Sequence, residues 1–338
     1  MMLSRRDILA ATLSAPLGLQ LGVARAAQTL KISHQFPGGT IEAGDFRDRL
    51  TRIFARDLEN RTNGAINAQI FPDSSLVKTV PQFSALRKGA LDLSLYPLSY
   101  AGGEVVETNI ALMPCLVSSY EQGAAWKKAA IGRALEKLLN DKGVVIVSWI
   151  WQAGGIASRK NPVILPEDAK GIKIRGGSRE FDMMLEAAGA ATLNIPSNEA
   201  YAALQTGACD AVLTSSTSLI SFRMEEVAKQ LTSGRGRSMW FMFEPLLMSK
   251  EIFDKLSKEQ RDIIMALGEQ LEAFGTKGAR DDDIAIESIF QKAGANVSPM
   301  DDVIVGKWRQ FAEKTAWKDF ADRNASCAEF LKMAQAVS

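Results

Sequence analysis

The chain has 338 residues, with 40 lysines and arginines against 39 aspartates and glutamates, and a single histidine. Because there is no basic excess to neutralise phosphates, nucleic acid is not an expected partner. One histidine excludes a histidine-rich zinc site and any mechanism that needs two histidines.

The first 26 residues have the order of a cleaved export signal. Arg5 and Arg6 precede an apolar stretch over residues 8–23, and residues 24–26 (Ala-Arg-Ala) form the small-x-small pattern that a signal peptidase cleaves. The adjacent arginines favour the twin-arginine route. A membrane anchor is the alternative, but a spanning helix needs about 20 apolar residues, and this stretch is shorter and contains Pro16. We therefore expect an exported, periplasmic protein.

Cleavage after residue 26 removes three basic residues and one acidic residue, which leaves 312 residues with 37 basic and 38 acidic side chains, a net charge of −1. Single hydrophobic cores stop growing near roughly 250–300 residues, so this length favours two lobes. No later stretch is long and apolar enough to cross a membrane, and the mature protein is expected to be soluble.

The three cysteines form no recognisable metal or disulfide pattern. Cys115, Cys209 and Cys327 are far apart, without a CxxC motif or nearby histidines, and an odd number does not suit a disulfide framework. Cys209 lies in an apolar run and is interpreted as a buried small hydrophobe. Pairing of Cys115 with Cys327 stays open, and neither a metal nor a cofactor is predicted.

In chain order, the mature sequence begins with a strand, a helix and a second strand. Residues 30–34 alternate between apolar and polar side chains, residues 43–62 have apolar residues close to helical spacing, and residues 65–71 form the next strand. This order at these lengths predicts an α/β fold with a parallel sheet.

A near-repeat relates two segments about 118 residues apart. Residues 85–92 and 203–210 share the pattern A-L-x-x-G-A-x-D. In each copy, a glycine in the left-handed conformation is expected to end a helix, and the chain turns directly into a buried strand, at 93–96 and at 211–213. The match predicts two similarly built α/β lobes.

The second lobe is predicted to begin after the apolar strand 144–149. Residues 172–175 and 239–248 form two further strands, and a long helix begins at Ser257, where Gln260 completes a capping box, and runs to about residue 293. We assign residues 28–150 with about 241–280 to lobe I and residues 151–240 with about 281–338 to lobe II, with hinges near 150 and 240.

Five motifs follow one another along the mature chain. They are Phe71-Pro72-x-Ser74-x-Leu76, Leu86-x-x-Gly89-Ala90-Leu91-Asp92, Met113-Pro114, Lys170-Gly171-x-Lys173-x-Arg175 and Pro196-x-x-Glu199-x-Tyr201-x-Ala203-Leu204-Gln205-x-Gly207-x-x-Asp210. In this order and spacing, the chain resembles the extracytoplasmic solute-binding proteins of TRAP (tripartite ATP-independent periplasmic) transporters, the DctP-type family.

The resemblance implies a two-lobed periplasmic binding protein fold of the type II kind, with hinge strands crossing between the lobes and a long helix spanning both. It implies that a small organic acid is held in the cleft between the lobes. The loaded protein, expected to be a monomer, would deliver this ligand to the membrane subunits of a TRAP permease driven by an ion gradient.

Arg175 is the residue expected to hold the ligand carboxylate, because the arginine of the K-G-x-K-x-R motif has this role in the family. A guanidinium is a planar fork that matches a carboxylate and keeps its charge when desolvated. Some relatives carry a second ligand-facing arginine about 20 residues earlier, where this chain has Gly155. Thr214 falls near a ligand-contacting asparagine of some relatives. These departures argue against a ligand with several charges.

Aromatic and uncharged polar residues occupy the segments expected to meet in the cleft, although ordinary core packing is the alternative for each aromatic side chain. They favour a monocarboxylate with an apolar or aromatic body. Gln152 is expected to contact the ligand or, as in keto-acid-binding relatives, a cation, and His34 either faces the cleft or caps a loop. The full set of predicted ligand-binding residues is Arg175, Gln152, Trp151, Tyr96, Thr214, Ser215, Trp240, Phe243 and His34.

Two other functions compete with transport. An enzyme on a related two-lobed scaffold would need a nucleophile with a base, a carboxylate pair or a metal, and the sequence offers little of this. The acidic run at residues 281–283 is most simply a solvated helix face. A binding protein that serves a sensor or another transporter is the second alternative. We expect a binding protein and not an enzyme.

Overall fold

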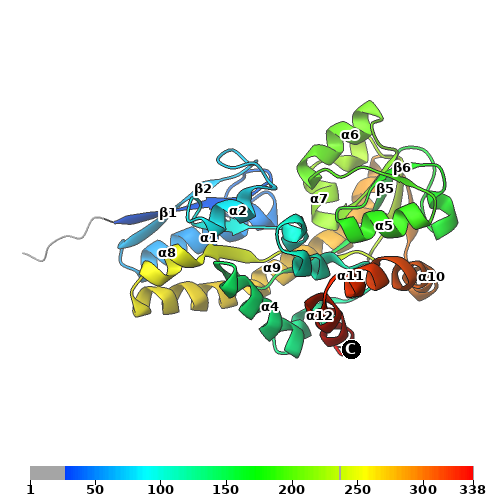
Figure 1. The fold of residues 1–338 in the computed structure, drawn as a ribbon. Helices are drawn as coiled ribbons and strands as arrows, with labels where there is room; N and C mark the ends of the chain where they lie inside the picture. Colours follow the sequence, from blue (N-terminus) through cyan, green and yellow to red (C-terminus); the bar gives the residue numbers. More distant parts are fainter. Residues whose placement is uncertain (1–26, 236, 338) are drawn as a thin grey trace, which may run out of the picture.

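The computed structural model describes residues 27–235 and 237–337, so the predicted signal peptide over residues 1–26 lies outside the described residues. The strands form two sheets, and the order of strands is β2-β1-β3-β11-β4 in one and β12-β9-β5-β8-β6-β7, with β10 beside β5, in the other. We call the elements around the first sheet lobe I and those around the second lobe II (Figure 1). The predicted two-lobed α/β fold is confirmed.

Lobe I begins as the sequence predicts, because β1 pairs in parallel with β2 and with β3. Its strands are β1 (Gln28–Ser33), β2 (Ile66–Phe71), β3 (Leu93–Leu95), β4 (Val144–Ser148) and β11 (Leu246–Ser249). Its helices are α1 (Phe46–Arg61), α2 (Gln82–Arg87), α3 (Tyr120–Trp126), α4 (Ala130–Asp141) and α8 (Lys250–Lys255), with 3-10 turns η1 (Leu98–Gly103) and η2 (Val106–Leu112).

Lobe II is built around one long strand, β5 (Trp151–Ser158), which pairs antiparallel with β8, β9 and β10. The other strands are β6 (Lys173–Arg175), β7 (Ala191–Thr192), β8 (Ala211–Ser215), β9 (Gln230–Ser233), β10 (Phe241–Phe243) and β12 (Asn296–Pro299). The helices are α5 (Arg179–Ala187), α6 (Ala200–Thr206) and α7 (Ser216–Ser221), with 3-10 turns η3 (Pro166–Ala169), η4 (Ser197–Glu199) and η5 (Met224–Glu226).

The chain crosses between the sheets twice in extended form. The first crossing joins β4 to β5, and the second joins β10 to β11. The single strand predicted over residues 239–248 is therefore two strands in different sheets, separated by Glu244 and Pro245. Proline lacks a backbone N–H and cannot continue a ladder in a sheet interior, which explains the break.

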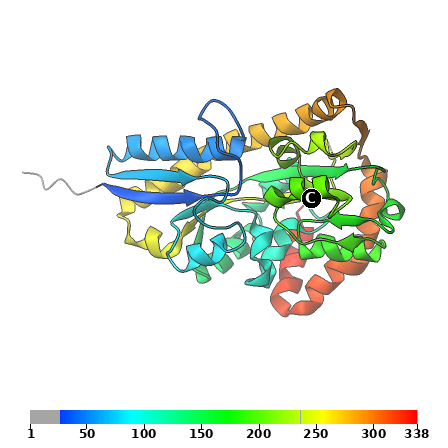
Figure 2. The ribbon, with the colours of Figure 1, turned by 90° about the horizontal axis from the view of Figure 1, so that it is seen from above.

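A 35-residue helix, α9 (Lys258–Lys292), packs against α1 and β4 of lobe I and against α7 and β5 of lobe II. Figure 2 shows it running along both lobes. The predicted capping box is present, because the Ser257 hydroxyl accepts from the Gln260 backbone N–H and the Gln260 side chain accepts from the Ser257 backbone N–H.

The near-repeat has the same geometry in both lobes. Gly89 and Gly207 have φ values of 65° and 79°. The aspartate that ends each copy then holds the neighbouring parallel strand, since Asp92 accepts from the Lys31 backbone N–H at 2.7 Å and Asp210 accepts from the Lys173 backbone N–H at 2.9 Å. The repeated pattern thus encodes the same turn and the same strand-to-strand contact twice.

The C-terminal segment touches both lobes. It comprises α10 (Asp302–Ala312), the π-helical turn η6 (Glu313–Trp317), α11 (Lys318–Arg323) and α12 (Ala325–Gln335). The turn η6 packs on α5 of lobe II, whereas α12 packs on α4 and η2 of lobe I.

Cys115, Cys209 and Cys327 are buried and free, so Cys115 and Cys327 do not pair. Within residues 27–235 and 237–337, no helix combines the length and the apolar character that a membrane span requires.

Candidate functional site

Arg175 is the last residue of β6, and its side chain is only 1% exposed. Its Nε donates to the Ile195 carbonyl at 3.0 Å and its Nη1 to the Leu213 carbonyl at 2.7 Å. A Cβ at Gly177 would lie 2.9 Å from Nη1, and the φ of 93° there also favours glycine. The glycine after the strand therefore lets the guanidinium lie against the backbone.

The third contact of Arg175 crosses between the lobes. Its Nη2 donates to the Tyr100 hydroxyl at 2.7 Å, and Tyr100 belongs to η1 of lobe I. The same hydroxyl accepts from the Ser197 backbone N–H at 3.1 Å. A guanidinium has five N–H donors, so two of them have no partner among the described residues. Two is the number that a bidentate carboxylate takes up.

Two tyrosines and one tryptophan surround this position. Tyr96 packs edge-on against Tyr100, with ring centroids 6.2 Å apart, and its hydroxyl donates to the Val80 carbonyl at 3.0 Å. Burial raises the pKa of Tyr96 well above its ordinary value, so the hydroxyl stays protonated. Trp240 is buried and its Nε1 donates to the Gly176 carbonyl, directly after Arg175, at 3.3 Å.

The crossing strand β5 presents two different faces. Gln152 and Gly154 share one face, because side chains alternate along a strand, and a Cβ at Gly154 would meet the Trp240 ring at 2.4 Å. Trp240 in turn contacts the residue directly after Arg175, through its hydrogen bond to the Gly176 carbonyl. Trp151 lies on the other face, where its ring is 5.1 Å from that of Phe243 and 5.1 Å from that of Trp126 in lobe I. Gln152 therefore lies on the face of the β5–β10 pair that carries Trp240, and Trp151 and Phe243 lie on the opposite face.

Glu244 lies on the Gln152 face of the paired strands. Met242 is opposite Gln152 in the β5–β10 register, and Glu244, two residues further, donates its backbone N–H to the Ile150 carbonyl. Its side chain is 1% exposed, and burial raises its pKa to about 7 against the opposing effect of Arg47. The nearest cationic atom is Nη1 of Arg47 at 3.6 Å.

Arg47, in the first turn of α1, is completely buried at the interface of the lobes. Two of its donors bind Asp45, from Nε at 2.9 Å and from Nη2 at 2.7 Å. Its Nη1 reaches lobe II, where it donates to the Ser218 hydroxyl at 3.0 Å and lies 3.5 Å from that of Ser215. Its guanidinium also stacks on the Phe36 ring, 3.6 Å from the centroid.

His34 faces α1. Its Nδ1 accepts from the Phe36 backbone N–H at 3.3 Å, and its Nε2 is 3.2 Å from Asp48. Burial acts to raise the pKa of Asp48, but the contacts with His34, Arg52 and the Gly39 backbone outweigh it and hold this pKa below its ordinary value. His34 therefore orders the loop after β1.

Three further predicted positions lie on or opposite β8. Thr214 is buried and pairs with Gly155 in the β5–β8 ladder. Ser215 is the N-cap of α7, accepting from the Ser218 backbone N–H. At Gly155 a Cβ would lie 2.5 Å from the Thr232 carbonyl oxygen. The backbone packing therefore leaves no room for the second arginine that some relatives carry there.

A cavity of about 700 Å³ lies between the lobes beside Tyr100. Residues from both lobes line it, among them Ser99, Tyr100, Asn109, Ser178, Asp182 and Ile195. Burial raises the pKa of Asp182 to about 7, although Arg175 and the Gly176 backbone act in the opposite direction. Tyr100, which binds the Arg175 guanidinium, is part of the lining.

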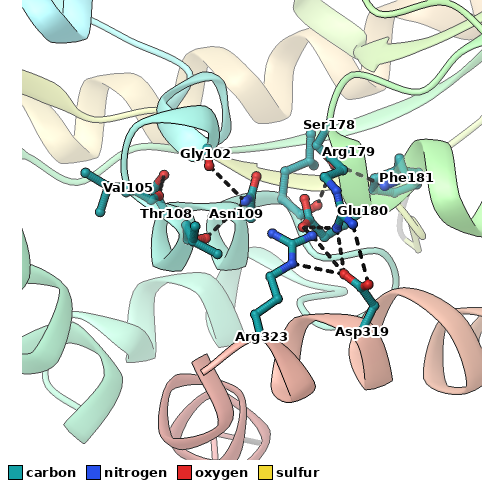
Figure 3. A network of polar contacts seen from close by, with 12 residues as sticks. Gly102, Val105, Thr108, Asn109, Ser178, Arg179, Glu180, Phe181, Asp319 and Arg323 are labelled. Atoms are coloured by element: carbon teal, nitrogen blue, oxygen red, sulfur yellow. Dashed lines mark hydrogen bonds and ion pairs between the residues drawn. The ribbon is translucent and has the colours of Figure 1, made fainter. Parts of the chain in front are cut away.

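A polar network holds the start of α5, the segment that follows Arg175 (Figure 3). The Ser178 hydroxyl donates to the Leu112 carbonyl of lobe I at 3.2 Å. Glu180 is completely buried, and Arg323 of α11 donates to it at 2.9 Å while also binding Asp319. Burial raises the pKa of Glu180 to about 7. The C-terminal helices thereby fix the helix next to the arginine.

Arg47 and Glu244 are the residues that sequence reasoning missed. Glu244 carried a signal, since it is the only charged residue in the apolar run 239–248. Arg47 carried none, because an arginine in a helix with other arginines is ordinarily exposed. Across residues 27–235 and 237–337, no cluster of three or more His, Cys, Asp or Glu side chains is placed to hold a metal ion.

Comparisons with known proteins identify the family of the chain. A family model described as "Bacterial extracellular solute-binding protein, family 7" matches residues 42–324. A solute-binding protein of Albidiferax ferrireducens is 61% identical over 311 residues, which cover 91% of this chain and 92% of that protein. The C4-dicarboxylate-binding periplasmic protein of Rhodobacter capsulatus is 27% identical, covering 77% of each chain.

Solved structures are similar along most of the chain. The crystal structure of a TRAP periplasmic solute-binding protein from Rhodoferax ferrireducens, with bound malonate, has a TM-score of 0.90 and 60% sequence identity, covering 91% of this chain and 98% of that one. With the family model matching most of the sequence, the chain belongs to the bacterial extracellular solute-binding proteins of family 7.

Proposed function

We propose that this protein captures a small organic acid in the periplasm, a monocarboxylate with an apolar or aromatic body, by closing its lobes around it. It then delivers the acid to a TRAP-type permease driven by an ion gradient. The observation that carries this proposal is the buried Arg175, which reaches across the cleft and keeps two N–H donors without a partner in the described chain.

One strong cation favours one ligand carboxylate. Arg47, the other buried arginine between the lobes, is already compensated by Asp45 and Glu244. Tyr96, Tyr100 and Trp240 supply flat apolar surfaces beside Arg175, which supports a body that is at least partly apolar. The similar Rhodoferax ferrireducens protein holds malonate. A short dicarboxylate is therefore the competing ligand class, and its affinity is to be compared with that of monocarboxylates.

Hinge closure is supported by contacts that span the lobes. Arg175 binds Tyr100, and Arg47 binds Ser218, so each lobe supplies an arginine to the other. Such contacts exist only when the lobes are together, and a ligand that binds both lobes favours that arrangement. Delivery to a permease rests on membership of the family.

The test is calorimetry with a panel of small acids on the wild-type protein and on Arg175→Ala. Removing one partner of a buried charged pair costs about 2–5 kcal/mol, so the affinity should fall about 30-fold or more. Arg159→Ala is the matched control, because Arg159 is in the same lobe at the end of β5. A folded Arg175→Ala protein with near-normal affinity, or turnover of a bound acid, would overturn the proposal.

A further inference from the structure

Three buried side chains near the cleft have polar atoms without a hydrogen-bond partner in the described part of the chain. These are both amide atoms of Gln35, both amide atoms of Gln152 and both carboxylate oxygens of Glu244. All three side chains are at most 2% exposed. Leaving a buried polar group unsatisfied costs about 1–3 kcal/mol, so native proteins rarely leave such groups without a partner.

Gln152 and Glu244 are neighbours on one face. Met242 is directly opposite Gln152, and Glu244, the residue after β10, is two positions beyond Met242 and continues the pairing by donating its backbone N–H to Ile150. Diagonal neighbours of this kind lie about 7–8 Å apart, a separation that two long side chains bridge with one small group between them. The same face of β5 carries Gly154 and so adjoins Trp240, beside the Arg175 loop.

Gln35 lies in the loop after β1 of lobe I. The next residue, Phe36, carries the Arg47 guanidinium on its ring, and Arg47 lies 3.6 Å from Glu244. The loop after β1 and the crossing strands therefore meet around Arg47.

The chemistry of these groups selects what fits between them. A carboxylate oxygen needs a donor, whereas an amide offers a donor and an acceptor. A hydroxyl group is the small group that satisfies both at once. A second carboxylate is disfavoured, because it would meet Glu244, and Arg47 is already bound to Asp45 through two hydrogen bonds.

We infer that the ligand carries a hydroxyl group on its carbon body, bound by Gln152 and Glu244 while Arg175 holds its carboxylate. The substrate class is then hydroxylated monocarboxylates, with one apolar face toward Trp240. This inference rests on the proposed function. Gln152 and Glu244 are specificity-determining residues in it.

The experiment compares acids that differ only by a hydroxyl: lactate with propionate, mandelate with phenylacetate, and 4-hydroxybenzoate with benzoate, with malonate as a fourth probe. Hydrogen bonds to charged groups are worth more than those to neutral ones. We therefore expect the hydroxylated member of at least one pair to bind about tenfold to 100-fold more tightly.

Two variants assign that preference. Gln152→Met removes both polar atoms at similar volume and should abolish most of the preference, whereas Glu244→Gln removes the charge and should reduce it about tenfold. Glu269→Gln, at a side chain that is 75% exposed, is the matched control and should leave it unchanged. Thermal unfolding checks that each variant is folded.

The inference would be overturned if both acids of every pair bound equally, or if the preference for the hydroxylated acid survived in both variants. The proposed function would still stand in that case, provided that binding depended on Arg175. The inference would also be overturned if malonate bound more tightly than any hydroxy acid and if Glu244→Gln increased the affinity for malonate. This end of the cleft would then be assigned to a second carboxylate. Failure of all the acids to bind would remove the proposed function and this inference with it.

Discussion

Nη2 of Arg175 in lobe II donates a 2.7 Å hydrogen bond to the Tyr100 hydroxyl in lobe I. The residue expected to hold the ligand thus also holds the two lobes together. Closure and ligand binding share one guanidinium, so weakening the contact between the lobes should weaken binding even where the ligand itself is not touched.

Tyr100→Phe tests this coupling. The variant removes the hydrogen bond from Arg175, which is worth about 1.5–3 kcal/mol because one partner is charged, and also the bond from the Ser197 backbone N–H. The affinity for the best-binding acid should fall about tenfold or more. Tyr96→Phe is the control, because the Tyr96 hydroxyl binds the Val80 carbonyl within lobe I. Calorimetry gives both affinities, and an equal loss in the two variants would contradict a specific role of the contact across the cleft.

Ser218→Ala probes the second contact between the lobes. Nη1 of Arg47 donates to the Ser218 hydroxyl at 3.0 Å, so the closed form should lose about 1 kcal/mol and the affinity should fall about fivefold. Ser221→Ala, in the same helix α7, should have no effect on affinity. Small-angle scattering of the liganded protein should show a larger open fraction for Ser218→Ala than for wild type, and identical profiles would argue against the expected effect.

The sequence predicted correctly those structural elements that are determined by residues close together in the chain. The capping box at Ser257 and Gln260 fixed the start of α9, and the repeated glycine and aspartate turn predicted two similar lobes. The strand predicted over 239–248 was wrong in one respect, because apolar periodicity does not reveal that the chain changes sheets at Glu244 and Pro245.

The site could be predicted only in part, for a physical reason. The position of Arg175 in its motif identified this residue. The side chains that a crossing strand presents on each face depend instead on how two strands pair that are distant in the sequence. Trp151 and Gln152 are adjacent in sequence and therefore point to opposite faces. Burial of Arg47 depends on partners from three segments, Asp45, Ser218 and Glu244, and no local pattern joins them.

Gly155→Ala tests whether the second arginine position of some relatives is closed by packing. An added Cβ would lie 2.5 Å from the Thr232 carbonyl oxygen, and overpacking of this kind costs about 1–3 kcal/mol. Gly306→Ala is the opposite case, because no atom lies within 4 Å of a Cβ built there in α10. It should stabilise the protein by about 0.5–1 kcal/mol. Urea denaturation measures both, and a neutral Gly155→Ala would contradict the packing argument.

Glu180→Gln should change how stability depends on pH. Burial raises the pKa of Glu180 in the folded protein to about 7 from an ordinary value of 4.5, so the folded state binds more protons than the unfolded state between these values. The resulting stability is fully present below pH 4.5 and is lost as the pH rises through 7. Glutamine cannot ionise and keeps an oxygen for Arg323, so the variant should match wild type near pH 5 and exceed it by about 1–3 kcal/mol at pH 8.

The measurement is urea denaturation at several pH values from 5 to 8. Wild type should lose stability across this range faster than Glu180→Gln, whereas the exposed-site variant Glu269→Gln should follow wild type. Burial also raises the pKa values of Asp182 and Glu244 to about 7. The unfolding free energy of Glu180→Gln should therefore still fall with pH, but less steeply than that of wild type. A difference between Glu180→Gln and wild type that is the same at every pH would mean that Glu180 does not titrate in this window. Its contact with Arg323 would then be that of a carboxylate ionised throughout.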